Sequence, residues 1–258
     1  MLPYPFSYFA NTFSAQRIFA GRKRLNFWQG LLTSLFLIAL LVFPNSLHIA
    51  RMDSYPLDTM IPGIYSPLTP QVMDDLKQIT ITDGKLSYTG KDHGQVYFDE
   101  TAHQLSGFSY QLATKQIILR NDDKTLAEIS YKDLKTSDFQ SRKELTQALS
   151  KAWFKTNRSS ITLLLITVSS LLLGVNFLIL LLGASGILYL TKRSKLFDFT
   201  SFGQCVTFTL NCLGIPTLVA CLTGLFGVQI ANLITIQNAL FVLLLIWVFF
   251  KTKFKDQA

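Results

Sequence analysis

The sequence predicts an α-helical polytopic membrane protein with four transmembrane helices and an inserted small extracellular α+β domain that contains an antiparallel sheet. Three observations lead to this fold class. The mean hydropathy is +0.32, and only 16% of the 258 residues are charged, whereas soluble domains carry about 25%. The apolar residues gather in four long runs, and the excess of basic residues lies beside those runs.

Each apolar run is long enough to cross a bilayer, which requires about 20 residues of helix. Lys and Arg occur only at the margins of the runs. Four uniformly apolar helices inside a soluble protein would be an unusual alternative. The first run resembles a signal peptide, but no small-residue cleavage site follows Pro44, so we expect an uncleaved anchor. The predicted spans are residues 25–46, 159–190, 201–228 and 232–250.

The charges predict how the spans are oriented. Residues 45–160 carry fourteen basic and fourteen acidic residues, so the net charge of +8 comes from three short flanking segments. Their basic residues are Arg17, Arg22, Lys23, Arg24, Lys192, Arg193, Lys195, Lys251, Lys253 and Lys255. Basic flanks mark the cytoplasmic side and face anionic lipid. We therefore expect a plasma-membrane protein with a cytoplasmic terminus (1–24), loop (191–200) and tail (251–258), an extracellular segment (47–158), and no nucleic-acid partner.

The cytoplasmic terminus shows helical spacing of apolar residues. Phe6, Phe9, Ala10 and Phe13 recur with polar residues between them. This pattern predicts a short amphipathic helix on the inner membrane surface. A poorly ordered aromatic terminus is the alternative.

The extracellular segment shows strand periodicity after a proline-rich entry. Thr69 and Pro70 are typical of a helix start, and we expect that helix to reach Gln78. Asp83-Gly84 is a hairpin signal between two strands. We expect one antiparallel sheet of five or six strands, from the candidates 79–82, 85–89, 95–99, 107–112, 115–121 and 126–131.

A helix follows the predicted sheet. Ser141 and Glu144 form a capping box, and the helix face that begins at Leu145 ends near Trp153 and Phe154. Aromatic residues followed by basic ones belong at a membrane interface. This helix therefore leads the outer domain into the second span.

No catalytic or cofactor motif is present. The three cysteines lie together in the third span, without the close pairing of zinc sites. His93 and His103 have acidic neighbours, but their spacing matches no metal motif. We find no phosphate-binding glycine loop and no zinc-protease motif. We therefore expect no enzyme activity, no cofactor and no metal.

Neutral amides are the main polar groups within the spans: Asn176, Gln204, Asn211, Gln237 and Asn238. Ion-coupled carriers usually keep an ionisable group within their spans, whereas no Asp, Glu, Lys or Arg lies in the middle of these runs. This difference disfavours an ion-coupled carrier. Ser170 with Gly174, and Ala220 with Gly224, are pairs of small residues that allow close helix packing. Pro216 is expected to kink or break the third span. A broken span can line a binding site, so Gln204, Asn211 and Pro216 are the candidate binding residues.

The order of these segments, with the proline-bearing stretch Gly214-Ile215-Pro216-Thr217 after a short basic loop, resembles the maltodextrose utilization protein MalA family of Gram-positive bacteria. That is a family of unknown function related to Yip1-like membrane proteins. The resemblance implies an accessory protein linked to carbohydrate uptake, without an established enzymatic activity.

We consider three functions. The first is a non-enzymatic membrane protein that contacts lipid and another membrane protein, such as a transporter or envelope complex. The alternative is a transporter subunit or channel with a site near the kinked third span. A lipid-modifying enzyme is the weakest, because Asp198 is the only acidic candidate near the inner interface and a helix cap explains it more simply.

Overall fold

In the computed structural model, residue 4 and residues 6–88, 92–194 and 196–256 are described. The expected strand end at Thr89 and the basic residue Lys195 lie outside them. The chain divides into a helical unit, residues 1–51 with 162–258, and a mixed unit, residues 52–161.

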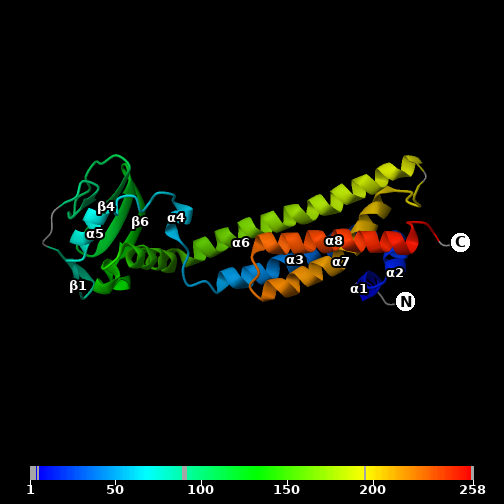
Figure 1. Cartoon of the computed structure of the whole chain (residues 1–258), viewed down its shortest axis with the longest axis horizontal. Helices are drawn as coiled ribbons and strands as arrows, with labels where there is room; N and C mark the ends of the chain where they lie inside the picture. The colour runs from blue at the N-terminus through cyan, green and yellow to red at the C-terminus, as the bar shows by residue number, and fades with distance from the viewer. Residues whose placement is uncertain (1–3, 5, 89–91, 195, 257–258) are drawn as a thin grey trace. The chain divides into compact units, whose positions relative to one another are not determined.

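The helical unit contains four helices long and apolar enough to cross a membrane, as predicted. They are α3 (Phe27–Ala50), the second part of α6 (Arg142–Leu190), α7 (Phe202–Leu225) and α8 (Ile230–Thr252). The ribbon shows them side by side in a bundle (Figure 1). Smaller helices complete this unit: α1 (Phe6–Thr12), α2 (Ala15–Ala20), η1 (Gly21–Lys23) and η4 (Thr191–Ser194).

Helix α7 forms the centre of the bundle. In its most apolar window 72% of the residues are buried, against 17–22% in the other three long helices. Those helices expose large apolar side chains, among them Leu35, Leu171 and Phe250. An exposed apolar surface of this extent is typical of contact with lipid or with another protein.

Two helices are longer than the sequence predicted. Helix α3 continues through Pro44, where the apolar run ends, to Ala50. Helix α6 is one helix from Arg142 to Leu190, whereas the sequence suggested a separate helix before the second span. Gly174 is the first glycine within α6, which contains no proline, so nothing in its first 30 residues interrupts the helix.

The N-terminal helices also differ from the expectation. Helix α1 exists, but the buried side chains are Tyr8 and Thr12, while Phe6 and Phe13 are 65% and 67% exposed. The buried face packs against α7, and α2 packs against α7 and α8. The terminus is thus part of the bundle core rather than a helix that lies only on a membrane surface.

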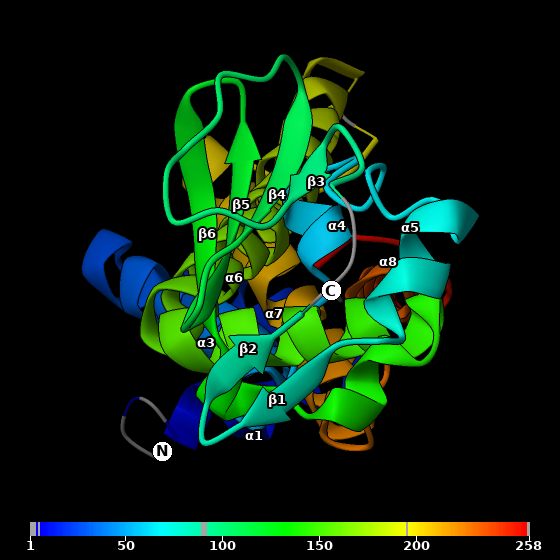
Figure 2. The same ribbon diagram turned by 90° about the vertical axis from the view of Figure 1, so that its left-hand side faces the viewer.

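The mixed unit has the six expected strands, divided into two sheets. A hairpin joins β1 (Thr80–Thr82) to β2 (Lys85–Ser87). The second sheet has the order β3-β4-β5-β6, with β3 (Val96–Tyr97), β4 (Phe108–Leu112), β5 (Gln116–Asn121) and β6 (Lys124–Ser130); Figure 2 shows these strands side by side. The other elements are α4 (Leu57–Met60), α5 (Pro70–Leu76), η2 (Tyr131–Asp133) and η3 (Thr136–Phe139).

The predicted antiparallel sheet is present in β4, β5 and β6, but it does not include all six strands. The hairpin is separate, and β3 pairs with β4 in parallel. The local signals were read correctly: Asp83 and Gly84 both have positive φ, 52° and 69°, as the tightest hairpin turns require. Thr69 caps α5 before Pro70. At the predicted capping box, the Glu144 backbone N–H donates to Ser141 Oγ, and Ser141 Oγ in turn donates to the Glu144 carboxylate, rather than the Ser141 backbone N–H doing so. Helix α5 ends at Leu76, two residues before the predicted end.

Candidate functional site

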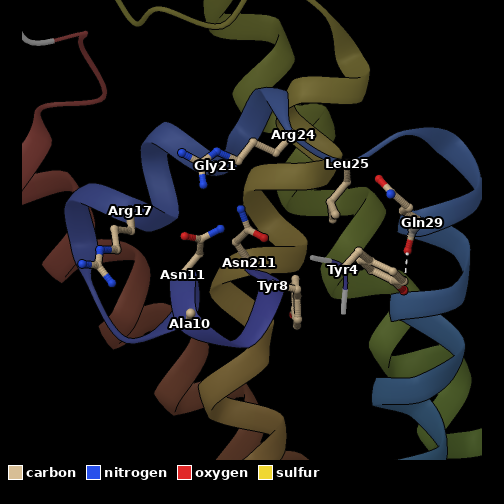
Figure 3. Close-up of a pocket in the computed structure, with 10 residues that line it drawn as sticks. All are labelled: Tyr4, Tyr8, Ala10, Asn11, Arg17, Gly21, Arg24, Leu25, Gln29 and Asn211. Atoms are coloured by element: carbon tan, nitrogen blue, oxygen red, sulfur yellow. Dashed lines mark hydrogen bonds between the residues drawn. The ribbon is translucent and has the colours of Figure 1, made fainter. Parts of the chain in front are cut away.

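A cavity of about 600 Å³ lies between the N-terminal helices, the start of α3 and the middle of α7. We call it the N-terminal pocket. Figure 3 shows its lining: Tyr4, Tyr8, Ala10, Asn11, Arg17, Gly21, Arg24, Leu25, Gln29 and Asn211. Its volume falls in the range of small-molecule sites.

Close contact between α1 and α7 forms one wall of this pocket. The Tyr8 hydroxyl donates to the Leu210 carbonyl oxygen over 2.9 Å. A Cβ added to Gly214 would lie 2.7 Å from Thr12 Cγ2 and 3.1 Å from Tyr8 Oη. The glycine therefore allows the two backbones to approach. Burial raises the pKa of the Tyr8 phenol far above its ordinary value, so the hydroxyl stays a neutral donor.

Asn211, one of the three candidate residues, lines the pocket and is only 2% exposed. Its Nδ2 donates to the Ile18 carbonyl oxygen over 3.2 Å. A Cβ on Gly21 would lie 3.1 Å from Asn211 Nδ2 and 3.7 Å from Asn11 Nδ2. The missing side chain at Gly21 leaves both amides next to open space, as the close-up shows (Figure 3).

The charged groups of the pocket are all cationic. Arg17 and Arg24 are exposed, and neither forms an ion pair with a described residue. No carboxylate is among the lining residues. The pocket therefore has a positive potential.

Gln204 and Pro216 do not join Asn211 in this site. Gln204 lines a different cavity at the start of α7, where its Oε1 accepts from the Thr200 backbone N–H over 3.1 Å. Pro216 is buried and lines neither cavity, and α7 continues through it without a break. The structure therefore does not bring these three residues together in one cavity, and α7 is not broken at Pro216.

The other amides of the spans bond to one another. Gln237 donates to Thr217 Oγ1 over 2.9 Å, and Asn176 donates to Gln237 and Asn238 over 3.3 and 3.2 Å. These bonds join α6, α7 and α8. Polar side chains that bond across helices in this way hold a bundle together.

Two pairs of small residues were predicted to allow close helix packing, and one of the two pairs does so. A Cβ on Gly224 would lie 2.8 Å from Pro44 Cβ, so the Ala220–Gly224 pair does permit close approach between α7 and α3. At Gly174 the nearest atom, Ile38 Cγ2, would be 3.8 Å away, which is an ordinary contact.

The sequence did not reveal a cluster around Arg22, at the same end of the bundle. The side chain of Arg22 is 1% exposed, and its Nη2 lies 2.7 Å from Asp256 Oδ1. Its guanidinium also lies 3.9 Å from the centre of the Phe19 ring. The place of Arg22 in the basic flank suggested an anchor that faces lipid. Because its side chain is buried, Arg22 does not have that role.

Asp198 belongs to this cluster as well. Its Oδ2 accepts from the Asp256 backbone N–H over 2.7 Å, and its carbonyl oxygen accepts from Arg22 Nε over 3.3 Å. Ser201, not Asp198, caps α7. The prediction that Asp198 is the helix cap was wrong, because its side chain turns to the tail instead.

The histidines that we considered as metal ligands lie apart in the mixed unit. His93 Nε2 contacts Asp75, and His103 Nε2 lies 3.0 Å from Asp99 Oδ2. Hydrogen bonds from Thr101 and His103 lower the pKa of Asp99 to about 2. Among the described residues, no three His, Cys, Asp or Glu side chains form a group that fits a metal ion. The three cysteines are free and buried in α7.

Comparison with known proteins identifies the family. The chain is 43% identical over 261 residues to the maltodextrose utilization protein MalA of Streptococcus pneumoniae, a match that covers 99% of this chain and 98% of that protein. No model of a protein family matches the sequence, and no solved structure matches it. Because the identity extends over almost the whole of both chains, the protein belongs to the maltodextrose utilization protein MalA family.

Proposed function

We propose that the protein is a non-enzymatic integral membrane accessory protein that takes part in maltodextrose utilization. It resides in the plasma membrane of a bacterium with both termini in the cytoplasm and residues 52–161 outside. The name of the relative supports the carbohydrate role. The basic flanks support the orientation, because the described parts of both termini are bonded together at one end of the bundle.

One observation carries the accessory role: the amides that α6 and α8 contribute to the spans are committed to bonds between helices. Gln237 bonds to both Asn176 and Thr217, and Asn176 also bonds to Asn238. A carrier or channel needs polar groups that are free to line a path. The helices α3, α6 and α8 instead present apolar outer faces, which suit lipid and a partner membrane protein.

A growth experiment tests the carbohydrate role. A strain that lacks the gene should grow more slowly on maltodextrose and normally on glucose, and the intact gene should restore growth. Equal growth of both strains on maltodextrose would contradict this role.

A reconstitution experiment separates the accessory role from transport. Vesicles that contain the purified protein alone should accumulate no labelled maltodextrose and conduct no ions. For crosslinking in native membranes, a photoreactive residue replaces the exposed Leu171. Illumination should then join the protein to a component of the maltodextrose uptake system, and no crosslink should form in the dark. Uptake by the protein alone would favour the transporter alternative.

A further inference from the structure

We propose that the N-terminal pocket binds a phosphate ester, with Arg17 and Arg24 as the cationic groups and Asn11 and Asn211 as neutral donors. This inference concerns a ligand and does not depend on the partnership proposed above.

The charge of the pocket favours an anionic ligand. The two guanidinium groups have no carboxylate partner among the described residues, and no acidic side chain lines the pocket. Asp256, an acidic residue at this end of the bundle, is occupied by Arg22 and Lys23. Guanidinium groups bind phosphate through paired, charge-assisted hydrogen bonds. An anion is therefore the ligand that complements this pocket.

Two amide side chains of the pocket are arranged as hydrogen-bond donors. Asn211 is 2% exposed and held by its bond to Ile18, so its side chain is fixed before any ligand arrives. Asn11 makes no hydrogen bond through its side chain to a described residue, which leaves its donors available. In the view of Figure 3 the guanidinium of Arg24 lies above these two amides, and Arg17 lies at the edge beyond Asn11. Preorganised donors around open space are what an anion site requires.

The size of the pocket indicates a ligand larger than phosphate alone. A volume of about 600 Å³ is several times what a phosphate group alone would occupy. The remaining wall is formed by Tyr4, Tyr8 and Leu25, which offer aromatic and aliphatic surface. The phosphate should therefore be attached to an organic group. A phosphorylated sugar and the headgroup of an anionic phospholipid share this chemistry.

A binding experiment on the purified full-length protein tests the site and distinguishes the two sources. In neutral detergent, calorimetry compares glucose 6-phosphate with glucose. Native mass spectrometry compares retention of phosphatidylglycerol with that of diglucosyldiacylglycerol, which has no phosphate. We expect at least one phosphorylated member of these pairs to bind and its phosphate-free counterpart to bind at least about tenfold more weakly. Binding of the sugar phosphate identifies a soluble ligand, and binding of the lipid alone identifies a headgroup site.

Variants connect the binding to the pocket. Arg24→Gln and Arg17→Gln should each weaken binding about tenfold or more. The matched control is Arg51→Gln, an exposed arginine at the other end of α3, which should leave binding unchanged. Gly21→Ala places a Cβ 3.1 Å from Asn211 Nδ2 without backbone strain, because Gly21 has helical φ, and should also weaken binding. An unchanged unfolding temperature shows that each variant is folded.

The proposal is overturned if neither phosphorylated probe binds the folded protein. It is also overturned if the phosphate-free counterparts bind equally well, or if Arg17→Gln and Arg24→Gln bind as tightly as Arg51→Gln.

Discussion

Arg22 and Asp256, which are 234 positions apart in the sequence, form a two-point contact: Arg22 Nη2 donates to Asp256 Oδ1 over 2.7 Å and to Oδ2 over 2.8 Å. The arginine is buried, whereas the side chain of Asp256 is 55% exposed. Arg22 also donates from Nη1 to the Phe19 carbonyl oxygen over 3.1 Å. The contact joins the N-terminal helices to the C-terminal tail and closes one end of the bundle.

We predict that Asp256→Asn destabilises the helical unit. The substitution removes the charge that pairs with buried Arg22, and a hydrogen bond to a charged group contributes about 1.5–3 kcal/mol. Because water screens the exposed carboxylate, we expect a loss of about 1 kcal/mol in the free energy of unfolding. Unfolding in detergent, followed by tryptophan fluorescence, measures the loss. Lys251→Gln, an exposed charge at the end of α8, is the control and should change stability little.

The same pair predicts a dependence of stability on pH. The hydrogen bond from Arg22 holds the pKa of Asp256 below its ordinary value. A carboxyl whose pKa is depressed by folding stabilises the protein above its unfolded pKa, near 4, and loses that contribution as the pH falls through the folded pKa. The difference in stability between the protein and Asp256→Asn should stay constant from about pH 8 to 5 and shrink below about pH 4. A difference that grows on acidification would contradict this assignment.

We predict that Gly214→Ala separates α1 from α7. The new Cβ would lie 2.7 Å from Thr12 Cγ2, and overpacking of this kind costs about 1–3 kcal/mol. Thr12→Ser removes Cγ2 and should restore part of the loss in the double variant. Gly183→Ala is the control, because nothing lies within 4 Å of its added Cβ. If Gly183→Ala and Gly214→Ala have equal unfolding temperatures, the docking of α1 described above is wrong.

We predict that Gln237→Leu weakens the contact between α7 and α8 but does not abolish folding. The change removes the hydrogen bond to Thr217 Oγ1 and the bond accepted from Asn176. Such bonds contribute about 0.6 kcal/mol on average within a bilayer, and less than about 2 kcal/mol at most. A double-mutant cycle with Thr217→Val should show a coupling of this size, and additive losses would mean that the two side chains do not interact.

Local signals in the sequence predicted much of the fold. The four apolar runs, the Asp83-Gly84 turn and the Ser141–Glu144 capping box depend on neighbouring residues, so periodicity and composition reveal them. Features that depend on distant residues were missed. The burial of Arg22 requires Asp256, and the parallel pairing of β3 requires β4.

The candidate site was predicted only in part. Asn211 was selected as an amide in a span, and it does line the pocket. Its neighbours in that pocket come from the N-terminal segment, which the sequence assigned to the membrane surface. A glycine within a span permits the close approach of another helix, and Gly214 is where α1 approaches α7.

The most direct test of the account is the sidedness of the two units. In a variant without the three native cysteines, Lys124→Cys probes the exposed first residue of β6, and Lys255→Cys probes the tail. An impermeant thiol reagent applied to intact cells should label Lys124→Cys alone, and both positions should react after the membrane is opened. Labelling of Lys255→Cys in intact cells, or protection of Lys124→Cys there, would contradict the proposed topology.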